Sequence, residues 1–349
     1  MKKTVLLALC GFGLAVSAAE AGSVVSAAGI AGDGTVPCSD AIQRLIDANP
    51  NREIFFPDGT YLLDKPICTP AHPRKSVSLR LSAYAKFTAV TNWTSPEAMV
   101  RLGAIHPANN IWKAGSWYWM KGGIVDGSGV ADGVSIDGGR ETLVADLSMK
   151  NVRVGLHIKR GANSGSSDAD IRNVNIVCNR AEESVGVLVD GYDNTLANMR
   201  IYGARRGVVV NGGGTMLRDI HPLFAMDRKQ FPRSVGVEVN AVDVWMDFCY
   251  SDQNAVGFKF GPKGAAVMDK CFCMWWMAEK GMRTTVLASE GAFNAQVNNL
   301  TVGFRSAESE NVLLAAGQPG GCGYLRDLRG NVHRVNDPAK GHEPYLRNK

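Results

Sequence analysis

The sequence predicts an all-β fold, a parallel β-helix in which short strands stack coil upon coil. Three observations favour it: a strand motif headed by glycine that recurs along the chain, a column of Asn or Asp residues out of phase with that motif, and an amphipathic segment ahead of both. The composition agrees, because 39 of the 349 residues are glycine and only 8% are aromatic. Such a composition is typical of many short strands and turns.

The strand motif reads glycine, apolar, any residue, apolar, and it recurs every 21 to 31 residues. The two apolar residues alternate with a variable residue, as expected for a strand with one buried face. The variable residue therefore faces outward. The copies are GVSI at 133, GLHI at 155, GVLV at 186, GVVV at 207, GVEV at 236 and GFKF at 257.

Asn or Asp stands immediately before an apolar residue that opens a second alternating run in each repeat. These residues tolerate a left-handed backbone, so the column predicts a repeated turn. Two strand columns and a turn per repeat fit the coils of a β-helix, whereas propeller blades need about 40 residues. The turn column comprises Asp146, Asn173, Asn198, Asp219, Asp247 and Asn299.

A capping helix is expected over residues 39–48, with Ser39 as its N-cap and an apolar face formed by Ala41, Ile42, Leu45 and Ile46. The following segment, IFFPDGTYLLDKPI at 54–67, places a turn signal between two apolar runs, and we expect it to start the first coil. The open end of a solenoid exposes unpaired strand edges, so the helix is expected to cover that end.

Residues 32–67 resemble the N-terminal segment of the pectate-lyase-like superfamily, a group of right-handed, single-stranded parallel β-helices related to rhamnogalacturonases, polygalacturonase-type glycoside hydrolases and polysaccharide epimerases. The matching pieces are GDGT at 32, AIQ at 41, ID at 46 and FPDGTY at 56, and GIVDGSG at 123 resembles a coil of the same group. The relatives carry a pair of Asp just before the helix, where this chain has PCSD at 37. The resemblance implies a right-handed solenoid.

One β-helix domain is expected over residues 24–335, between a signal peptide at 1–21 and a polar C-terminal tail at 336–349. The first residues combine two lysines, an apolar run and small residues at the expected cleavage site, which is the pattern of a secretory signal. The protein is therefore expected to be secreted or periplasmic, without membrane insertion. The sequence makes no prediction of oligomeric state.

The charge of the chain predicts no nucleic-acid partner. It carries 38 basic and 33 acidic residues, a net charge of +5 that is scattered along the sequence. A mildly basic surface suits an anionic polysaccharide, which is the partner that we expect.

Three functions follow from the resemblance, which implies an exported protein acting on polysaccharide. The first is a lyase or epimerase-like enzyme that removes a proton from uronic-acid-containing glycans. The second is a glycoside hydrolase of the pectinase type that uses paired carboxylates. The third is a non-catalytic glycan-binding or adhesion solenoid. The ordered motifs of the polygalacturonase-type hydrolases are absent, so no catalytic residue is carried over from them.

The first candidate site centres on His221, which is expected above Arg200 of the previous coil and below Cys249 of the next. A charged insertion follows His221, and aromatic residues lie in the next two coils. Rings beside charged groups suit sugars, although some of the tryptophans are alternatively core residues. The catalytic candidates here are His221, Asp219, Asp247 and Asp227, and the substrate-binding candidates are Arg200, Arg228, Trp245, Tyr250, Asp252, Trp275 and Trp276.

The second candidate site places His157 and Lys159 between Asp137 and Asp190 of the adjacent coils. A basic group flanked by carboxylates is a candidate proton acceptor. The alternative is a ladder of opposite charges that stabilises stacking.

No cofactor is predicted, and no metal-ligand spacing is present, although calcium on exposed Asp residues stays an alternative. A disulfide between Cys38 and Cys68 is expected in the cap. Cys249 and Cys271, one coil apart, are expected either to stack as buried residues or to form a second disulfide.

Overall fold

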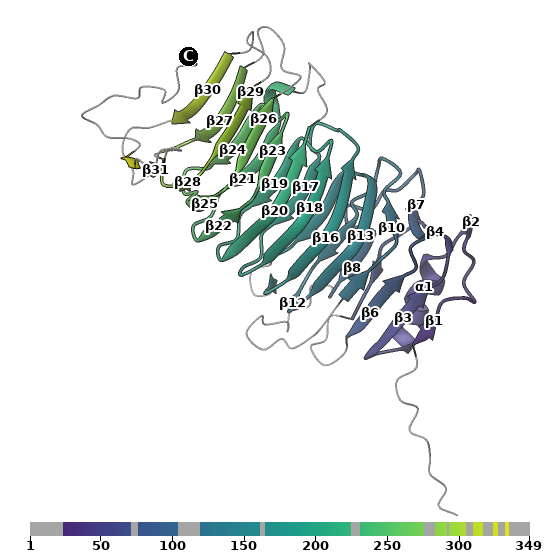
Figure 1. Cartoon of the computed structure of the whole chain (residues 1–349). Coiled ribbons are helices and arrows are strands. Elements are labelled where there is room, and N and C mark those ends of the chain that lie inside the picture. The colour runs from purple at the N-terminus through teal and green to yellow at the C-terminus, as the bar shows by residue number, and fades with distance from the viewer. Residues whose placement is uncertain are drawn as a thin grey trace, which may run out of the picture.

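The computed structural model describes residues 24–70, 76–103, 119–160, 165–224, 231–275, 283–291, 293–304, 310–316, 324–326 and 332–334. The predicted signal peptide and the predicted C-terminal tail lie outside these ranges. The described residues form an elongated stack of parallel strands with the N-terminal helix at one end (Figure 1). This is the predicted all-β parallel β-helix.

One flat sheet, called sheet B, takes one strand from each coil. The predicted glycine-headed motifs form six of its ten strands, in the predicted order and register. Its members are β5 (Ile67–Cys68), β8 (Val100–Leu102), β11 (Val134–Ile136), β14 (Val154–Ile158), β17 (Val185–Val189), β19 (Arg206–Val210), β21 (Val235–Val239), β24 (Val256–Phe260), β27 (Arg283–Ser289) and β30 (Glu310–Ala316).

The glycines of the motif stack on one another, which explains why the motif begins with glycine. A Cβ placed on Gly133 would lie 2.7 Å from the carbonyl oxygen of Gly155, and one on Gly155 would lie 2.5 Å from that of Gly186. Contacts this short force the backbone apart, so only glycine permits the observed spacing of the coils.

The other strands form sheet A, which has two columns joined at a bend. Four long strands run through both columns: β13 (Leu143–Val152), β16 (Asp170–Cys178), β18 (Thr195–Tyr202) and β20 (Thr215–Leu223). The remaining strands of the first column are β1 (Val25–Ser26), β3 (Arg52–Phe56), β6 (Val77–Leu81), β9 (Trp119–Lys121), β22 (Val244–Asp247), β25 (Ala266–Asp269), β28 (Gln296–Asn298) and β31 (Tyr324–Arg326), which pairs antiparallel with β32 (Val332–Arg334). Those of the second column are β2 (Asp33–Pro37), β4 (Gly59–Leu63), β7 (Ala85–Ala89), β10 (Ile124–Asp126), β23 (Tyr250–Asp252), β26 (Phe272–Trp275) and β29 (Thr301–Phe304).

The bend between the columns is the predicted turn. Its residues have a positive φ, for example 53° at Asn173 and 54° at Asp219, and Asn173 Nδ2 donates to Asp146 Oδ1 over 2.7 Å. The prediction is wrong by one residue at Asp247, because Arg218 pairs with Asp247 and the left-handed residue is therefore Phe248, with φ 54°.

Helix α1 (Ser39–Ala48) forms over the predicted residues and contributes to the core at the N-terminal end. Ile42 and Ile46 are fully buried, and burial of such a side chain stabilises the fold by roughly 1.5–3 kcal/mol. The predicted cap is wrong by one residue, since Cys38 is the N-cap. Ser39 Oγ instead accepts hydrogen bonds from the backbone amides of Asp64 and Lys65.

The described cysteines are free thiols, so the expected disulfide between Cys38 and Cys68 is wrong. Cys38 Sγ donates to the carbonyl oxygen of Leu62 instead. Cys249 and Cys271 are buried neighbours, and the Cys271 thiol together with burial holds the pKa of Cys249 far above its ordinary value. They therefore stack as neutral core residues, the first of the two alternatives.

Two smaller features complete the described fold. β12 (Gly139–Arg140) and β15 (Ser166–Ser167) pair beside the corner between sheet B and sheet A, and the 3-10 helix η1 (Phe231–Arg233) precedes β21. Within the described ranges, no helix has both the length and the apolar character needed to cross a bilayer.

Candidate functional site

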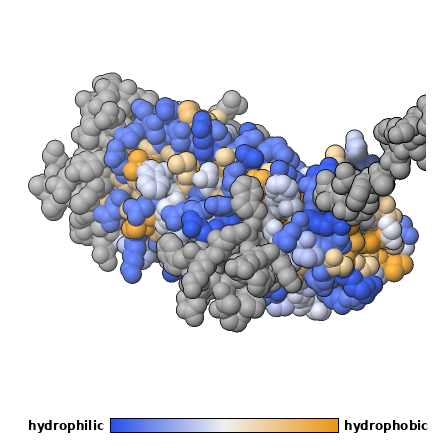
Figure 2. All heavy atoms as spheres, turned by 90° about the horizontal axis from the view of Figure 1, so that it is seen from below, coloured by the Kyte–Doolittle hydropathy of each residue, from blue (hydrophilic) through white to orange (hydrophobic). Residues whose placement is uncertain are grey.

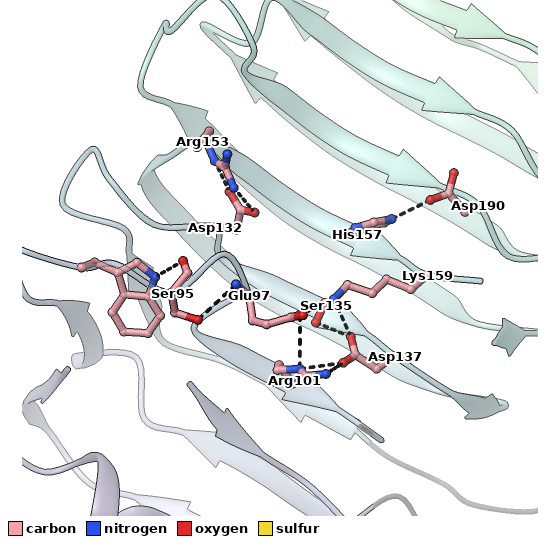
Figure 3. A network of polar contacts seen from close by, with 11 residues as sticks. Ser95, Glu97, Arg101, Asp132, Ser135, Asp137, Arg153, His157, Lys159 and Asp190 are labelled. Carbon is pink, nitrogen blue, oxygen red and sulfur yellow. Dashed lines mark hydrogen bonds and ion pairs between the residues drawn. The ribbon is translucent and has the colours of Figure 1, made fainter. Parts of the chain in front are cut away.

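Sheet B carries a group of polar side chains on its outer face, here called the sheet-B network. The register pairs Ser135 with His157, and it brings Asp137, Lys159 and Asp190 to the ends of successive strands, as predicted. The network comprises Glu97, Arg101, Ser135, Asp137, His157, Lys159 and Asp190 (Figure 3).

Asp137 lies at the centre of the network and is fully buried, with 0% exposure. Its Oδ1 accepts a hydrogen bond from Ser135 Oγ over 2.6 Å and lies 3.5 Å from Lys159 Nζ. Its Oδ2 lies 2.5 Å from Arg101 Nη2. A buried carboxylate needs such partners, and this one has them on both oxygens.

Glu97 lies just before β8 and pairs with Lys159, with Oε2 2.5 Å from Nζ. The hydrogen bond from Lys159 holds the pKa of Glu97 below its ordinary value, with Arg101 contributing in the same direction. Both basic groups of this half of the network are thereby neutralised.

His157 pairs with Asp190, with Nε2 2.6 Å from Oδ2, and Asn211 Nδ2 donates to the other oxygen over 2.7 Å. Burial opposes ionisation of Asp190, but the hydrogen bonds from His157 and Asn211 outweigh it and hold its pKa below the ordinary value. The network as a whole satisfies its own charges, which is the arrangement of the ladder alternative.

A second group, here called the His221 cluster, lies on the second column of sheet A. It comprises Arg200, His221, Tyr250 and Asp252. Arg200 is paired with His221 in register, as predicted. The prediction that Cys249 is the neighbour of His221 in the next coil is wrong. The shifted bend turns Cys249 into the core and brings Tyr250 beside His221. The imidazole and the phenol stack with ring centroids 4.2 Å apart and an interplanar angle of 18°.

The polar atoms of the His221 cluster are poorly satisfied. His221 Nε2 and Asp252 Oδ1 are buried atoms without a hydrogen-bond partner among the residues that the structure describes. Nε2 lies 3.6 Å from Asp252 Oδ2, and the side chains are 25% and 10% exposed. Unsatisfied buried polar atoms are rare and mark places where a ligand or water is expected.

Arg200 is exposed and forms no ion pair within the part of the chain that the structure describes. Its Nη1 makes only long hydrogen bonds, of 3.4 Å, to Asn198 Oδ1 and the carbonyl oxygen of Met199. The guanidinium is therefore uncommitted, and it lies one coil from the imidazole.

Two carboxylates that the sequence grouped with His221 lie elsewhere. Asp219 is the bend residue itself and lies 3.6 Å from Arg218 Nε. Asp247 belongs to the first column, beside Asp269 and with Oδ1 3.9 Å from Lys270 Nζ. The bend separates Asp247 from the outer face that carries His221.

The tryptophans divide between core and surface. Trp275 is fully buried, and its Nε1 donates to the carbonyl oxygen of Asn254, so its assignment to substrate binding is wrong. Trp245 is 44% exposed but lies on the first column, across the bend from His221. Asp227, Arg228 and Trp276 lie outside the described residues.

No cluster of three His, Cys, Asp or Glu side chains suited to a metal ion is present among the described residues. Calcium on exposed Asp residues stays an untested alternative from the sequence.

A groove of about 670 Å³, here called the corner groove, lies where the loops that follow sheet B enter the first column. Trp245 is the one sequence-predicted site residue in its lining. The pattern that could have revealed it is the run of short polar and glycine-rich loops after each strand motif. The lining comprises Arg140, Ser167, Asp168, Tyr192, Asp193, Asn211, Gly213, Gly214, Asn240, Ala241, Val242, Asp243, Trp245 and Lys263.

No protein-family model matches the chain, and no curated protein matches it. Solved structures match its fold. An alginate lyase from Paenibacillus sp. str. FPU-7 aligns with a TM-score of 0.56 and 13% identity, over 78% of this chain and 97% of that one. The enzymatically active domain of tailspike protein 2 of bacteriophage CBA120 gives 0.62 and 12%, over 83% and 47%. ORF18 of Geobacillus virus E2 gives 0.53 and 14%, over 85% and 59%. The chain thus spans only about half the length of the two viral proteins.

Proposed function

We propose that this chain is an exported, polysaccharide-active β-helix protein that abstracts a proton from uronate units at the His221 cluster, as a lyase or an epimerase-like enzyme. One observation carries the proposal: an imidazole and a carboxylate with unsatisfied buried atoms lie beside an arginine that has no ion-pair partner among the described residues. Charged and polar groups that do not pair with one another are available to bind a substrate or to react with it.

Each member of the cluster has a role in this chemistry. Arg200 would bind the uronate carboxylate and reduce its charge, which makes the neighbouring C5–H more acidic. Asp252 Oδ2 lies 3.6 Å from Nε2 of His221, which is too far for a hydrogen bond, but its negative charge favours the tautomer with the proton on Nε2, so the lone pair on Nδ1 would accept the C5 proton.

In a lyase, the electron pair of the broken C5–H bond forms the C4–C5 double bond as the C4–O bond breaks. The departing glycosidic oxygen then takes a proton from the phenol of Tyr250, which stacks on the imidazole and is replenished from solvent. In an epimerase, the electron pair of the broken C5–H bond would instead pass into the uronate carboxylate as an enolate beside Arg200, and C5 would take a proton from solvent on the opposite face, so the C4–O bond stays intact.

Two independent likenesses support a polysaccharide substrate. Residues 32–67 resemble the pectate-lyase-like superfamily, and the solved structures of similar fold include a protein described as an alginate lyase and an enzymatically active tailspike domain. The secretory pattern at residues 1–21 supports export.

The hydrolase alternative receives less support from the geometry. Of its proposed carboxylates, Asp219 occupies the bend, Asp247 lies across it and Asp252 is nine-tenths buried beside His221. A retaining or inverting pair must flank one glycosidic bond, and these three do not share a face.

The test is incubation of the purified full chain with a panel of polyuronates, mixed uronate heteropolysaccharides and neutral glucans. A lyase produces the ultraviolet absorbance of an unsaturated uronate, an epimerase changes the C5 configuration seen by proton NMR, and a hydrolase yields reducing ends without either. Glycan binding without any product would assign the chain to the binder class and contradict the proposal.

Two matched histidine variants locate the activity. We expect His221→Ala to lower turnover by about 10²–10⁴-fold, the usual contribution of a general base, and His157→Ala to leave turnover nearly unchanged. The opposite result would move the site to the sheet-B network.

A further inference from the structure

The corner groove has an exposed aromatic platform. Trp245 is 44% exposed, and no ring or cation stacks on it within the described ranges. Register places Met216 and Val267 on either side of it in the adjacent coils, and both are exposed. The three side chains thus form an exposed apolar row across adjacent coils, of which Trp245 lines the groove. In Figure 1 β12, β22 and β25 lie along the lower edge of the solenoid, and Figure 2, which views the molecule from below, shows a mainly hydrophilic surface with small apolar patches.

The second aromatic ring of the groove is already occupied. The guanidinium of Arg160 lies 4.0 Å from the ring centroid of Tyr192. One face of the Tyr192 ring is therefore covered by a cation, whereas the Trp245 ring has no such partner within the described ranges.

The floor of the groove is low because its residues are small. Gly213 and Gly214 lie between Trp245 and the loop of Tyr192, and a Cβ on Gly214 would collide with the carboxylate of Asp193. Gly214 also has a φ of 69°, which disfavours other residues. Backbone at this position leaves room for a flat ligand.

The charge of the lining does not suit a polyanion. Asp168 is paired with Arg140, with Oδ2 2.8 Å from Nε, and neither Asp193 nor Asp243 forms an ion pair among the described residues. Carboxylates without cation partners repel uronates but accept hydrogen bonds from sugar hydroxyls. The lining thus has one more acidic group than basic groups: Asp168, Asp193 and Asp243 against Arg140 and Lys263.

We propose that the corner groove is a second carbohydrate site that binds neutral pyranose units, with Trp245 as the stacking platform and Asp193 and Asp243 as hydroxyl acceptors. The C–H face of a pyranose packs on an exposed indole, and the carboxylates fix its orientation. This inference stands apart from the chemistry proposed at the His221 cluster, because the bend places the two sites on different columns of sheet A.

The experiment is isothermal titration calorimetry of the full chain with tetrasaccharides of β-glucose, α-glucose, β-galactose and β-mannose, and with a tetrasaccharide of uronic acid. At least one neutral tetrasaccharide is expected to bind the wild-type chain. Trp245→Ala is expected to weaken that binding about tenfold or more, and Trp245→Tyr to restore part of it.

The control is Tyr84→Ala, which removes an aromatic ring that is 78% exposed outside the groove and is expected to leave the affinity unchanged. His221→Ala is likewise expected to keep the affinity, which separates failure of this inference from failure of the proposed activity. Absence of binding by every neutral sugar, equal binding by Trp245→Ala, or tighter binding of the uronate through Trp245 would each overturn the inference.

Discussion

The sheet-B network and the His221 cluster contain the same kinds of side chain and use them differently. Each has a histidine beside an aspartate of the next coil and an arginine nearby, which lies one coil from the histidine in the His221 cluster and two coils from it in the sheet-B network. In the sheet-B network His157 lies 2.6 Å from Asp190, whereas His221 lies 3.6 Å from Asp252. Arg101 contacts Asp137 directly, whereas Arg200 has no carboxylate partner among the described residues.

The difference shows that residue type alone does not separate a self-neutralising ladder from the cluster that we propose as the reactive site. Charges that neutralise one another across coils contribute to stacking, and their net effect on a ligand is small. Charges that lack partners cost folding free energy, which is the signature expected of groups retained for function. Equivalent substitutions in the two regions should therefore give opposite results.

The largest effect on stability is expected for Asp137→Asn. The substitution leaves Arg101 and Lys159 without the buried carboxylate between them, and breaking a buried pair typically costs about 3–5 kcal/mol. Urea unfolding followed by circular dichroism measures the change. Asp168→Asn is the control, because its pair with Arg140 is about one third exposed and should contribute about 0–1 kcal/mol. Equal costs at the two positions would contradict the distinction.

The same substitution in the other region, Asp252→Asn, should lower activity and keep stability. It removes a buried carboxylate whose Oδ1 has no partner, so the free energy of unfolding should stay the same or rise. Turnover of the polysaccharide that the panel identifies should fall about 10²-fold, because His221 loses the group that fixes its tautomer. A loss of several kcal/mol with activity intact would place Asp252 in the scaffold.

The next effect in size is the difference in stability between His157→Gln and His221→Gln. His157 loses a hydrogen bond to a partly exposed carboxylate, which should cost about 1 kcal/mol, whereas His221 Nε2 has no hydrogen bond to lose. Urea midpoints of the two variants measure the difference, and turnover should fall only for His221→Gln. A larger loss of stability at His221 would reverse the comparison.

Much of the fold could be predicted because the strand motif and the turn column are local patterns. The alternation that places Val134 and Ile136 in the core can be recognised within the four residues of one strand motif. The same alternation, continued from Cys271, would also have placed Trp275 in the core. Cys271, Cys273 and Trp275 are buried, and the residues between these three are only partly buried. The one-residue shift of the turn to Phe248 could not be predicted, because Asp247 followed by Phe248 is the same pattern of Asp before an apolar residue as in the earlier turns.

The state of each candidate site could not be predicted for a different reason. Lys159 is neutralised by Glu97, 62 residues away, and the distances between His157 and Asp190 or His221 and Asp252 depend on side-chain conformations across coils. The sequence placed Arg200 beside His221 correctly, because that contact needs only the register. The sequence grouped Trp245 and Asp247 with His221 wrongly. The alternation shows that a side chain points outward, but it does not show which of the two columns of sheet A carries that side chain.

The smallest expected effect is a pH dependence that belongs to the sheet-B network. The folded-state pKa values of Asp190 and Glu97 lie below their ordinary values of 3.8 and 4.5. A group with a depressed folded-state pKa adds stability above its ordinary value and loses it as the pH falls through the folded value. The thermal midpoint should therefore be flat near neutral pH and fall below about pH 4.5, where these carboxyl groups take up protons in the unfolded chain before they do so in the folded network. In Asp190→Asn, the slope of this fall should be reduced while the neutral-pH midpoint drops modestly, because one of the two titrating carboxylates is gone. An acid slope identical to that of the wild type would mean that Asp190 gains nothing from His157 and Asn211, and would remove the basis for calling the network self-satisfied.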